Sequence, residues 1–187
     1  MIEFSHYDET NAPDDSKPLL NDSIASFGMI PGLHAVMAEA PGLLEAYQRV
    51  HALFSNSSFS KDDRTVVWLT VNVENECHYC VPAHTYLAKA EGVDEAIVTA
   101  LRDETPLPSA RLEALRTFTL KVIRQHGVLS DADVNAFLDA GYTRRNVLEV
   151  ILGYAQKVMS NYTNHVAQTP VDAPFQKYAW TRTKEAA

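Results

Sequence analysis

Residues 59–93, "FSKDDRTVVWLTVNVENECHYCVPAHTYLAKAEGV", contain the two cysteines of this 187-residue chain. The segment "TVVWLTVNV" is rich in β-branched residues and would suit a buried strand. A helix is favoured instead, because Ser60 and Asp63 have capping-box spacing and the apolar run is too continuous to alternate. Pro82 indicates that a second helix begins close to the cysteines, since proline is tolerated in a first helical turn. The stretch therefore predicts two successive helices, with Cys77 and Cys80 near the start of the second.

The rest of the chain continues this helical pattern. Ser109, Ser130 and Thr143 each stand where a cap is expected, directly before a helical pattern of apolar residues. Residues 1–16 are polar and acidic without periodicity, and we expect an extended or mobile arm there. Residues 17–187 form one unit in this interpretation. The sequence thus predicts an all-α fold with a single helical domain.

Charge and hydropathy exclude several classes of partner. The chain has 16 Lys and Arg against 24 Asp and Glu, a formal net charge of −8, which argues against nucleic acid or an anionic membrane as its partner. No run approaches about 18 consecutive apolar residues, so no membrane span is expected. The acidic start lacks the basic and apolar regions of a secretory signal, and a cytoplasmic location is expected.

The cysteine spacing indicates redox chemistry. Cys80 and His84 are four residues apart and share one face of a helix. Thiols near a helix N-terminus have lowered pKa values, because free N–H groups and the helix dipole stabilise the thiolate. A second thiol close by can then close a disulfide. His84 is a candidate acceptor of the thiol proton, and Glu74 a candidate proton relay.

Three other interpretations of the cysteine pair are possible. Attachment of haem requires a histidine directly after the second cysteine, where this chain has Val81. A zinc ion could take Cys77, Cys80 and His84 with a fourth ligand such as His165, although three ligands on one helical turn differ from the usual split zinc sites. Two buried core cysteines are the third interpretation. The redox pair is favoured, with no metal or cofactor expected.

Further polar residues near the motif are candidates for the wall of a pocket. His78 could orient a thiol, although an exposed side chain at a helix start is the default. Tyr79 either lines a pocket or packs. His165 belongs to a polar cluster with Asn161 and Asn164, which fits either a pocket wall or a subunit interface.

On these residues the stretch 59–101 resembles the carboxymuconolactone decarboxylase and AhpD-like alkylhydroperoxidase superfamily. The similarity is greatest to its uncharacterised peroxidase-related branch. The resemblance rests on a capped helix, then C-x-x-C-x-x-x-H, then a helix closed by a glycine. "GYAQKVMSNYTNHVAQTPVD" at residues 153–172 resembles the closing helix of the same branch.

The resemblance implies a function and an assembly. It implies an all-helical homo-oligomer, a trimer or hexamer, that reduces hydroperoxides with a cysteine pair recycled by a dithiol reducing partner. By position, Cys80 is the implied peroxide-attacking thiolate, Cys77 the resolving thiol, and His84 a member of the proton relay.

Two positions depart from the alkylhydroperoxidase pattern. Its members carry a glutamate twelve residues before the first cysteine, where this chain has Thr65. They also carry a histidine directly before the second cysteine, where this chain has Tyr79. Glu74 is our candidate substitute for the missing glutamate. The alternatives to a peroxide reductase are non-redox acid–base chemistry on a small organic acid, and an inert or zinc-holding oligomeric scaffold.

Overall fold

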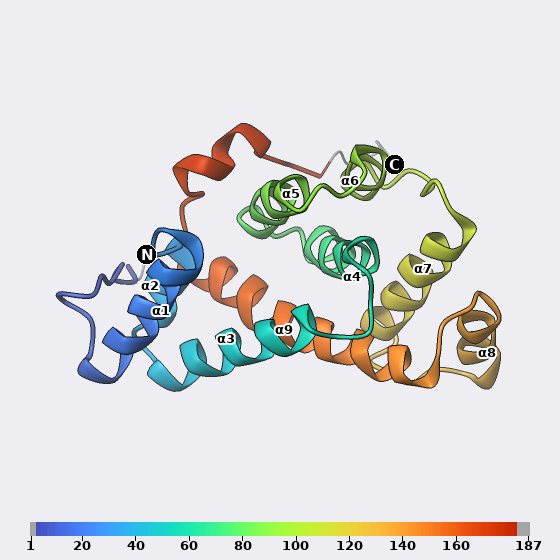
Figure 1. Cartoon of the computed structure of the whole chain (residues 1–187), viewed down its shortest axis with the longest axis horizontal. Helices are drawn as coiled ribbons and strands as arrows, with labels where there is room; N and C mark the ends of the chain where they lie inside the picture. Colours follow the sequence, from blue (N-terminus) through green and yellow to red (C-terminus); the bar gives the residue numbers. More distant parts are fainter. Residues whose placement is uncertain (1–2, 183–187) are drawn as a thin grey trace.

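The structure, a computed structural model, describes residues 3–182, and every regular element in that part of the chain is a helix (Figure 1). The predicted all-α fold is therefore confirmed. In chain order the elements are η1 (Asp14–Ser16), α1 (Lys17–Phe27), α2 (Gly32–Met37), α3 (Pro41–Ser55), α4 (Lys61–Glu74), α5 (Cys80–Ala90), α6 (Glu95–Arg102), α7 (Ala110–Arg124), α8 (Asp131–Asp139), α9 (Arg144–Ala167) and η2 (Ala173–Tyr178).

Helix α4 settles the ambiguity of the β-branched segment. Ser60 Oγ accepts the backbone N–H of Asp63, and the Asp63 carboxylate accepts the backbone N–H of Ser60, so the predicted capping box is present. Residues 65–73 are all buried, because α4 packs against α5, α6, α7 and α9. A helix enclosed on every side needs no polar face, which explains why its sequence reads like a buried strand.

The other predicted helix starts are also confirmed. The side chains of Ser109, Ser130 and Thr143 each accept a backbone N–H in the first turn of α7, α8 and α9. Helix α5 begins at Cys80 and has Pro82 in its first turn, as the sequence predicts. Each of these contacts lies within four residues, so it is specified locally.

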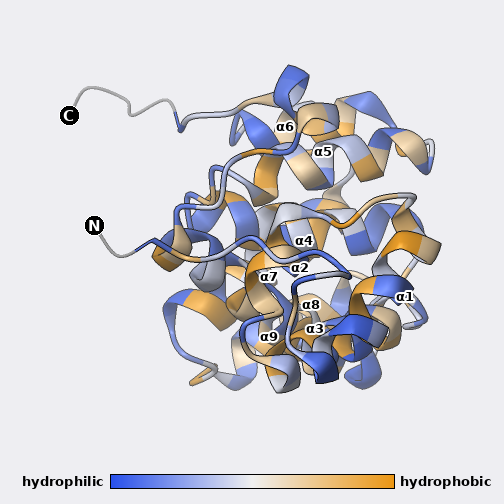
Figure 2. Cartoon of the chain, turned by 90° about the vertical axis from the view of Figure 1, so that its left-hand side faces the viewer, coloured by the Kyte–Doolittle hydropathy of each residue, from blue (hydrophilic) through white to orange (hydrophobic). Residues whose placement is uncertain are grey.

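Two apolar clusters form the core. One lies between α4, α6, α7 and α9, and the other between α1, α2, α3 and the start of α5, where it includes both cysteines. Helix α9 packs against helices of both clusters, namely α2 and α3 on one side and α4 and α7 on the other (Figure 1). In Figure 2, hydrophobic stretches alternate with hydrophilic ones along the helices around α4, as expected for helices that bury one face.

Two irregular segments help to enclose the start of α5. An arm is expected over residues 1–16, of which residues 1–2 lie outside the described part. The backbone N–H of Tyr7 donates to the carbonyl of Ala35 over 3.1 Å, which ties the arm to α2. After α9 the chain returns across α5, and η2 packs against that helix. Residues 183–187 of the expected domain also lie outside the description. None of the described helices combines the length and apolar character that crossing a membrane requires.

Candidate active site

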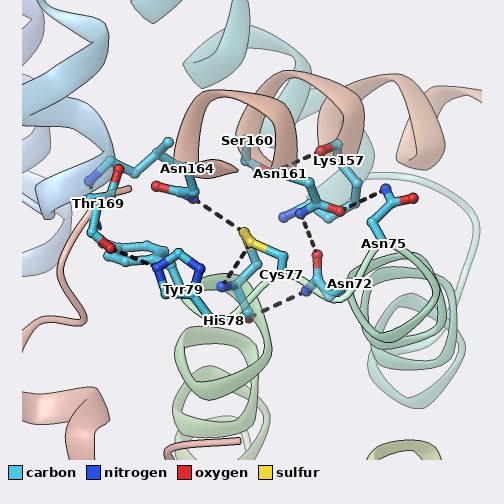
Figure 3. Close-up of a disulfide and its surroundings, with 12 residues drawn as sticks. Asn72, Asn75, Cys77, His78, Tyr79, Lys157, Ser160, Asn161, Asn164 and Thr169 are labelled. Carbon is cyan, nitrogen blue, oxygen red and sulfur yellow. Dashed lines mark hydrogen bonds between the residues drawn. A yellow bond between two sulfur atoms is a disulfide. The ribbon is translucent and has the colours of Figure 1, made fainter. Parts of the chain in front are cut away.

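The cysteine pair lies at the junction between α4 and α5. Cys77 occupies the turn before the helix and Cys80 is its first residue, with Cα atoms 5.3 Å apart and the two sulfurs joined as a disulfide (Figure 3). The backbone N–H of Cys80 donates to Cys77 Sγ over 3.2 Å. Both residues are buried, and the helix N-terminus faces the sulfurs as the spacing predicts.

A network of asparagines fixes this junction against α9. Asn164 Nδ2 donates to Cys80 Sγ over 3.2 Å, and Asn161 Nδ2 donates to Asn72 Oδ1 over 2.9 Å (Figure 3). Asn72 Nδ2 in turn donates to the carbonyl of Cys80. An amide N–H directed at a sulfur stabilises negative charge there, so Asn164 favours the thiolate form of Cys80 once the disulfide is reduced.

A cavity of about 60 Å³ lies beside Cys80, and Cys77 is not among its lining residues. Aromatic rings make up part of its wall: Phe27, Tyr47, Tyr79 and Phe175. Basic side chains make up another part: His34, His51, His84 and Lys157. One water needs about 10–15 Å³ by this kind of measure, so the cavity has room for a small molecule of a few heavy atoms.

His84 and Lys157 form a buried pair on the wall of this cavity. Lys157 Nζ lies 2.6 Å from His84 Nε2, within hydrogen-bonding distance, and Lys157 is 1% exposed. Burial lowers the pKa of Lys157 from 10.5 to about 7. The pKa of His84 is also lowered, to well below 6.5, mainly by burial and to a smaller extent by the positive charge of Lys157. The imidazole is therefore neutral at neutral pH, and the amine is poised to gain or lose a proton.

The remaining basic groups of the cavity are neutral as well. Burial lowers the pKa of His51 to about 4, and that of His34 to about 3. The His51 ring stacks on Trp68 with centroids 5.5 Å apart, and its Nδ1 lies 3.0 Å from Gln156 Nε2. The His34 Nδ1 lies 2.8 Å from the Ser23 hydroxyl.

The structure does not bring Glu74 to the cysteine pair. Its carboxylate accepts hydrogen bonds from Arg124 over 2.7 and 2.8 Å, and the residue lines a separate groove. The Arg124 hydrogen bonds are also the main cause of a lowered pKa at Glu74. Thr65, at the position of the family glutamate, lines a second, smaller cavity together with His84. Lys157 is thus the titratable group hydrogen-bonded to this histidine.

The three further candidates have different environments. Tyr79 lines the cavity, and its hydroxyl donates to the carboxylate of Asp172 and accepts the N–H of Leu33. The His78 ring turns away, with Nε2 3.0 Å from the carbonyl of Thr169 (Figure 3). His165 is not among the residues that line the cavity beside Cys80.

His84 faces Lys157, and the described residues include no group of three or more His, Cys, Asp or Glu side chains placed to hold a metal ion.

Lys157 and His51 are not among the site residues predicted from the sequence, although the sequence carries a signal for both. Lys157 lies between Gly153 and Asn161 on the buried face of α9, and His51 follows Tyr47 at helical spacing on α3. A basic residue inside the buried stripe of a helix is the anomaly that marks such positions.

Comparison with known proteins is consistent with this fold. Residues 41–116 match the model of the Carboxymuconolactone decarboxylase family. No curated protein sequence matches the chain.

Solved structures match over nearly the whole length. One is the alkylhydroperoxidase AhpD core, an uncharacterized peroxidase-related protein from Ralstonia eutropha JMP134, with 21% identity, a TM-score of 0.80, and coverage of 94% of this chain and 96% of that chain. An uncharacterized peroxidase-related protein from Silicibacter sp. TM1040 has 20% identity, a TM-score of 0.76, and coverage of 93% and 95%. A variant of the debrominase Bmp8 in complex with 2,3,4-tribromopyrrole has 13% identity, a TM-score of 0.78, and coverage of 95% of both chains. At these identities the likeness shows a shared fold.

Proposed function

We propose that this chain is a thiol-dependent hydroperoxide reductase of the AhpD-like superfamily, to which its partial match to the Carboxymuconolactone decarboxylase family and its structural likeness to peroxidase-related proteins point. The observation that carries the proposal is the placement of Cys80 on the wall of the cavity, with Cys77 behind it at bonding distance. A reactive thiol and a resolving thiol require this relationship.

The first step uses the reduced pair. The Cys80 thiolate attacks the outer oxygen of a hydroperoxide, the O–O bond breaks, and the products are a sulfenic acid on Cys80 and an alcohol. The leaving oxygen needs one proton, and His84 with its hydrogen-bonded Lys157 faces the same cavity. Protonated Lys157 supplies that proton, directly or through His84. Lys157 thereby takes the role of proton donor that the resemblance assigns to the glutamate missing from this chain.

The second step closes the disulfide. The Cys77 thiol attacks the Cys80 sulfenic acid, a sulfur–sulfur bond forms, and water leaves. A dithiol partner then reduces this bond, taking up the oxidised state as its own disulfide. Asn164, which donates to Cys80 Sγ, stabilises the Cys80 thiolate that the first step requires.

The test is a thiol count on fully reduced protein before and after one equivalent of ethyl hydroperoxide, which is small enough for the cavity beside Cys80. The parent chain has two cysteines, so complete oxidation removes both thiols. We expect Cys77 to survive as a thiol in Cys80→Ser, and Cys80 to form a sulfenic acid in Cys77→Ser. Oxidation of the parent no faster than that of a free thiol in solution would refute the proposal.

Reductive dehalogenation is a second candidate, favoured by the aromatic walls of the cavity and by the structural likeness to the debrominase Bmp8. In this reaction an aryl bromide and two thiols give the debrominated ring, bromide, a proton and the disulfide, so atoms and electrons balance. Incubation of the reduced protein with 2-bromopyrrole, a smaller aryl bromide than the ligand of Bmp8, followed by bromide measurement, separates the two candidates. Bromide release in a stoichiometry of one per disulfide, with slow peroxide reduction, would favour this second function.

A further inference from the structure

Lys157 is a buried amine, and none of the described residues that line the cavity with it is acidic. Fully buried lysines are normally paired with a carboxylate, because an ammonium removed from water is costly. The Lys157 side chain lies on the wall of the cavity beside Cys80, and its one hydrogen bond in the described part of the chain goes to His84. Its environment therefore favours the neutral amine, which is a nucleophile.

The polar groups that line the cavity together with Lys157 come from α2, α3, α5 and α9, and none of those described is acidic. They are His34 from α2, Tyr47 and His51 from α3, Tyr79 and His84 from α5, and Ser160 from α9. The carboxylate of Asp172 lies behind Tyr79, where it accepts the Tyr79 hydroxyl and the N–H of Gly32. No carboxylate among the described residues is therefore placed to hold Lys157 as an ammonium ion.

We propose that Lys157 is a second nucleophile of this cavity and condenses with small aldehydes or ketones to form an imine. The neutral amine attacks the carbonyl carbon, and the carbinolamine then loses water to give a carbon–nitrogen double bond. His84 Nε2, 2.6 Å from the amine, accepts the proton that the nitrogen releases and returns it to the departing hydroxyl. The reaction consumes no electrons and is reversible by hydrolysis.

This activity goes beyond the proposed reductase function and does not depend on it. In the oxidised protein Cys77 and Cys80 are joined, so neither sulfur competes with the amine for the carbonyl compound. The cavity volume of about 60 Å³ fits a carbonyl compound of about four or five heavy atoms. The aromatic walls favour an apolar substituent on the carbonyl carbon.

The experiment is competitive labelling within one molecule. Oxidised protein is treated with limiting propanal and sodium cyanoborohydride at pH 6.5, and propylation of each lysine is followed by peptide mass spectrometry. With a pKa of about 7, roughly a quarter of Lys157 is neutral at this pH, against about one part in ten thousand for an ordinary exposed lysine. We expect Lys157 to be labelled at least about 100-fold faster than the exposed Lys177.

Two variants complete the test. The double variant Cys77→Ala, Cys80→Ala should keep the fast labelling of Lys157, whatever happens to peroxide reduction. Loss of peroxide reduction with retained labelling would separate the two activities. Lys157→Arg should lose the fast labelling and leave that of Lys177 unchanged. Labelling of Lys157 in the parent at the rate of Lys177, or slower, overturns the proposal without reference to any variant.

Discussion

Replacing Lys157 by methionine removes a buried amine but keeps nearly the same length and volume. In the parent, burial lowers the pKa of this amine from 10.5 to about 7. The unfolded chain therefore binds more protons than the folded chain between pH 7 and pH 10.5. The free energy of unfolding of the parent therefore rises with pH across that interval and falls again as the pH is lowered toward 7. Lys157→Met removes this dependence.

The size of the effect follows from that pKa. One tenfold change in proton affinity is worth about 1.4 kcal/mol, so the free energy of unfolding of the parent should gain about 3 kcal/mol relative to the variant between pH 7 and pH 9.5. The variant also leaves His84 Nε2 without its hydrogen-bond partner, which costs about 1–3 kcal/mol at every pH. We therefore expect Lys157→Met to be more stable than the parent at pH 7, and we expect this advantage to shrink by about 3 kcal/mol when the pH is raised to 9.5.

The assay is urea unfolding of both chains at the two pH values, followed by far-ultraviolet circular dichroism. The exposed Lys177→Met is the matched control, because it makes the same chemical change on the surface of the chain. Peroxide reduction by Lys157→Met should be slowed, because the leaving oxygen loses its proton source. Identical pH dependence of stability in the parent and Lys157→Met would refute the argument that this amine is buried without a counter-charge.

Three further predictions concern packing, acid stability and assembly. A Cβ added at Gly153 would lie 2.7 Å from a ring carbon of Phe54, so Gly153→Ala should lower the free energy of unfolding by about 1–3 kcal/mol, measured by urea titration. Burial lowers the pKa of His51 to about 4, so the free energy of unfolding falls as the pH drops below 6.5, where the unfolded chain binds a proton that the folded chain does not. His51→Phe should therefore lose about 2 kcal/mol less of its free energy of unfolding between pH 7 and pH 5 than the parent, measured by urea titration at the two pH values. Leu148 and Ile151 are exposed on the outer face of α9, and we expect the chain to self-associate there. Sedimentation velocity of Ile151→Glu should then show a smaller species than the parent, and equal sizes would contradict this assignment.

Much of the helical framework was specified by short stretches of sequence. The Ser60–Asp63 capping box, the caps before α7, α8 and α9, and Pro82 in the first turn of α5 each act within four residues. A local hydrogen bond does not depend on how distant helices pack, so its signature survives in the sequence alone. The position of the cysteines at a helix N-terminus was predictable for the same reason.

The identity of the proton-transfer partner was decided by tertiary structure. Glu74 is three residues from Cys77, yet its carboxylate pairs with Arg124, fifty residues later in the chain. Lys157 is 73 residues from His84 and nevertheless lies within hydrogen-bonding distance of it. Sequence proximity fixes the order of side chains around one helix, whereas the angle and register between α4, α5 and α9 decide which charges meet. Those quantities arise from the packing of the whole core, including the close approach at Gly153, and no short motif encodes them.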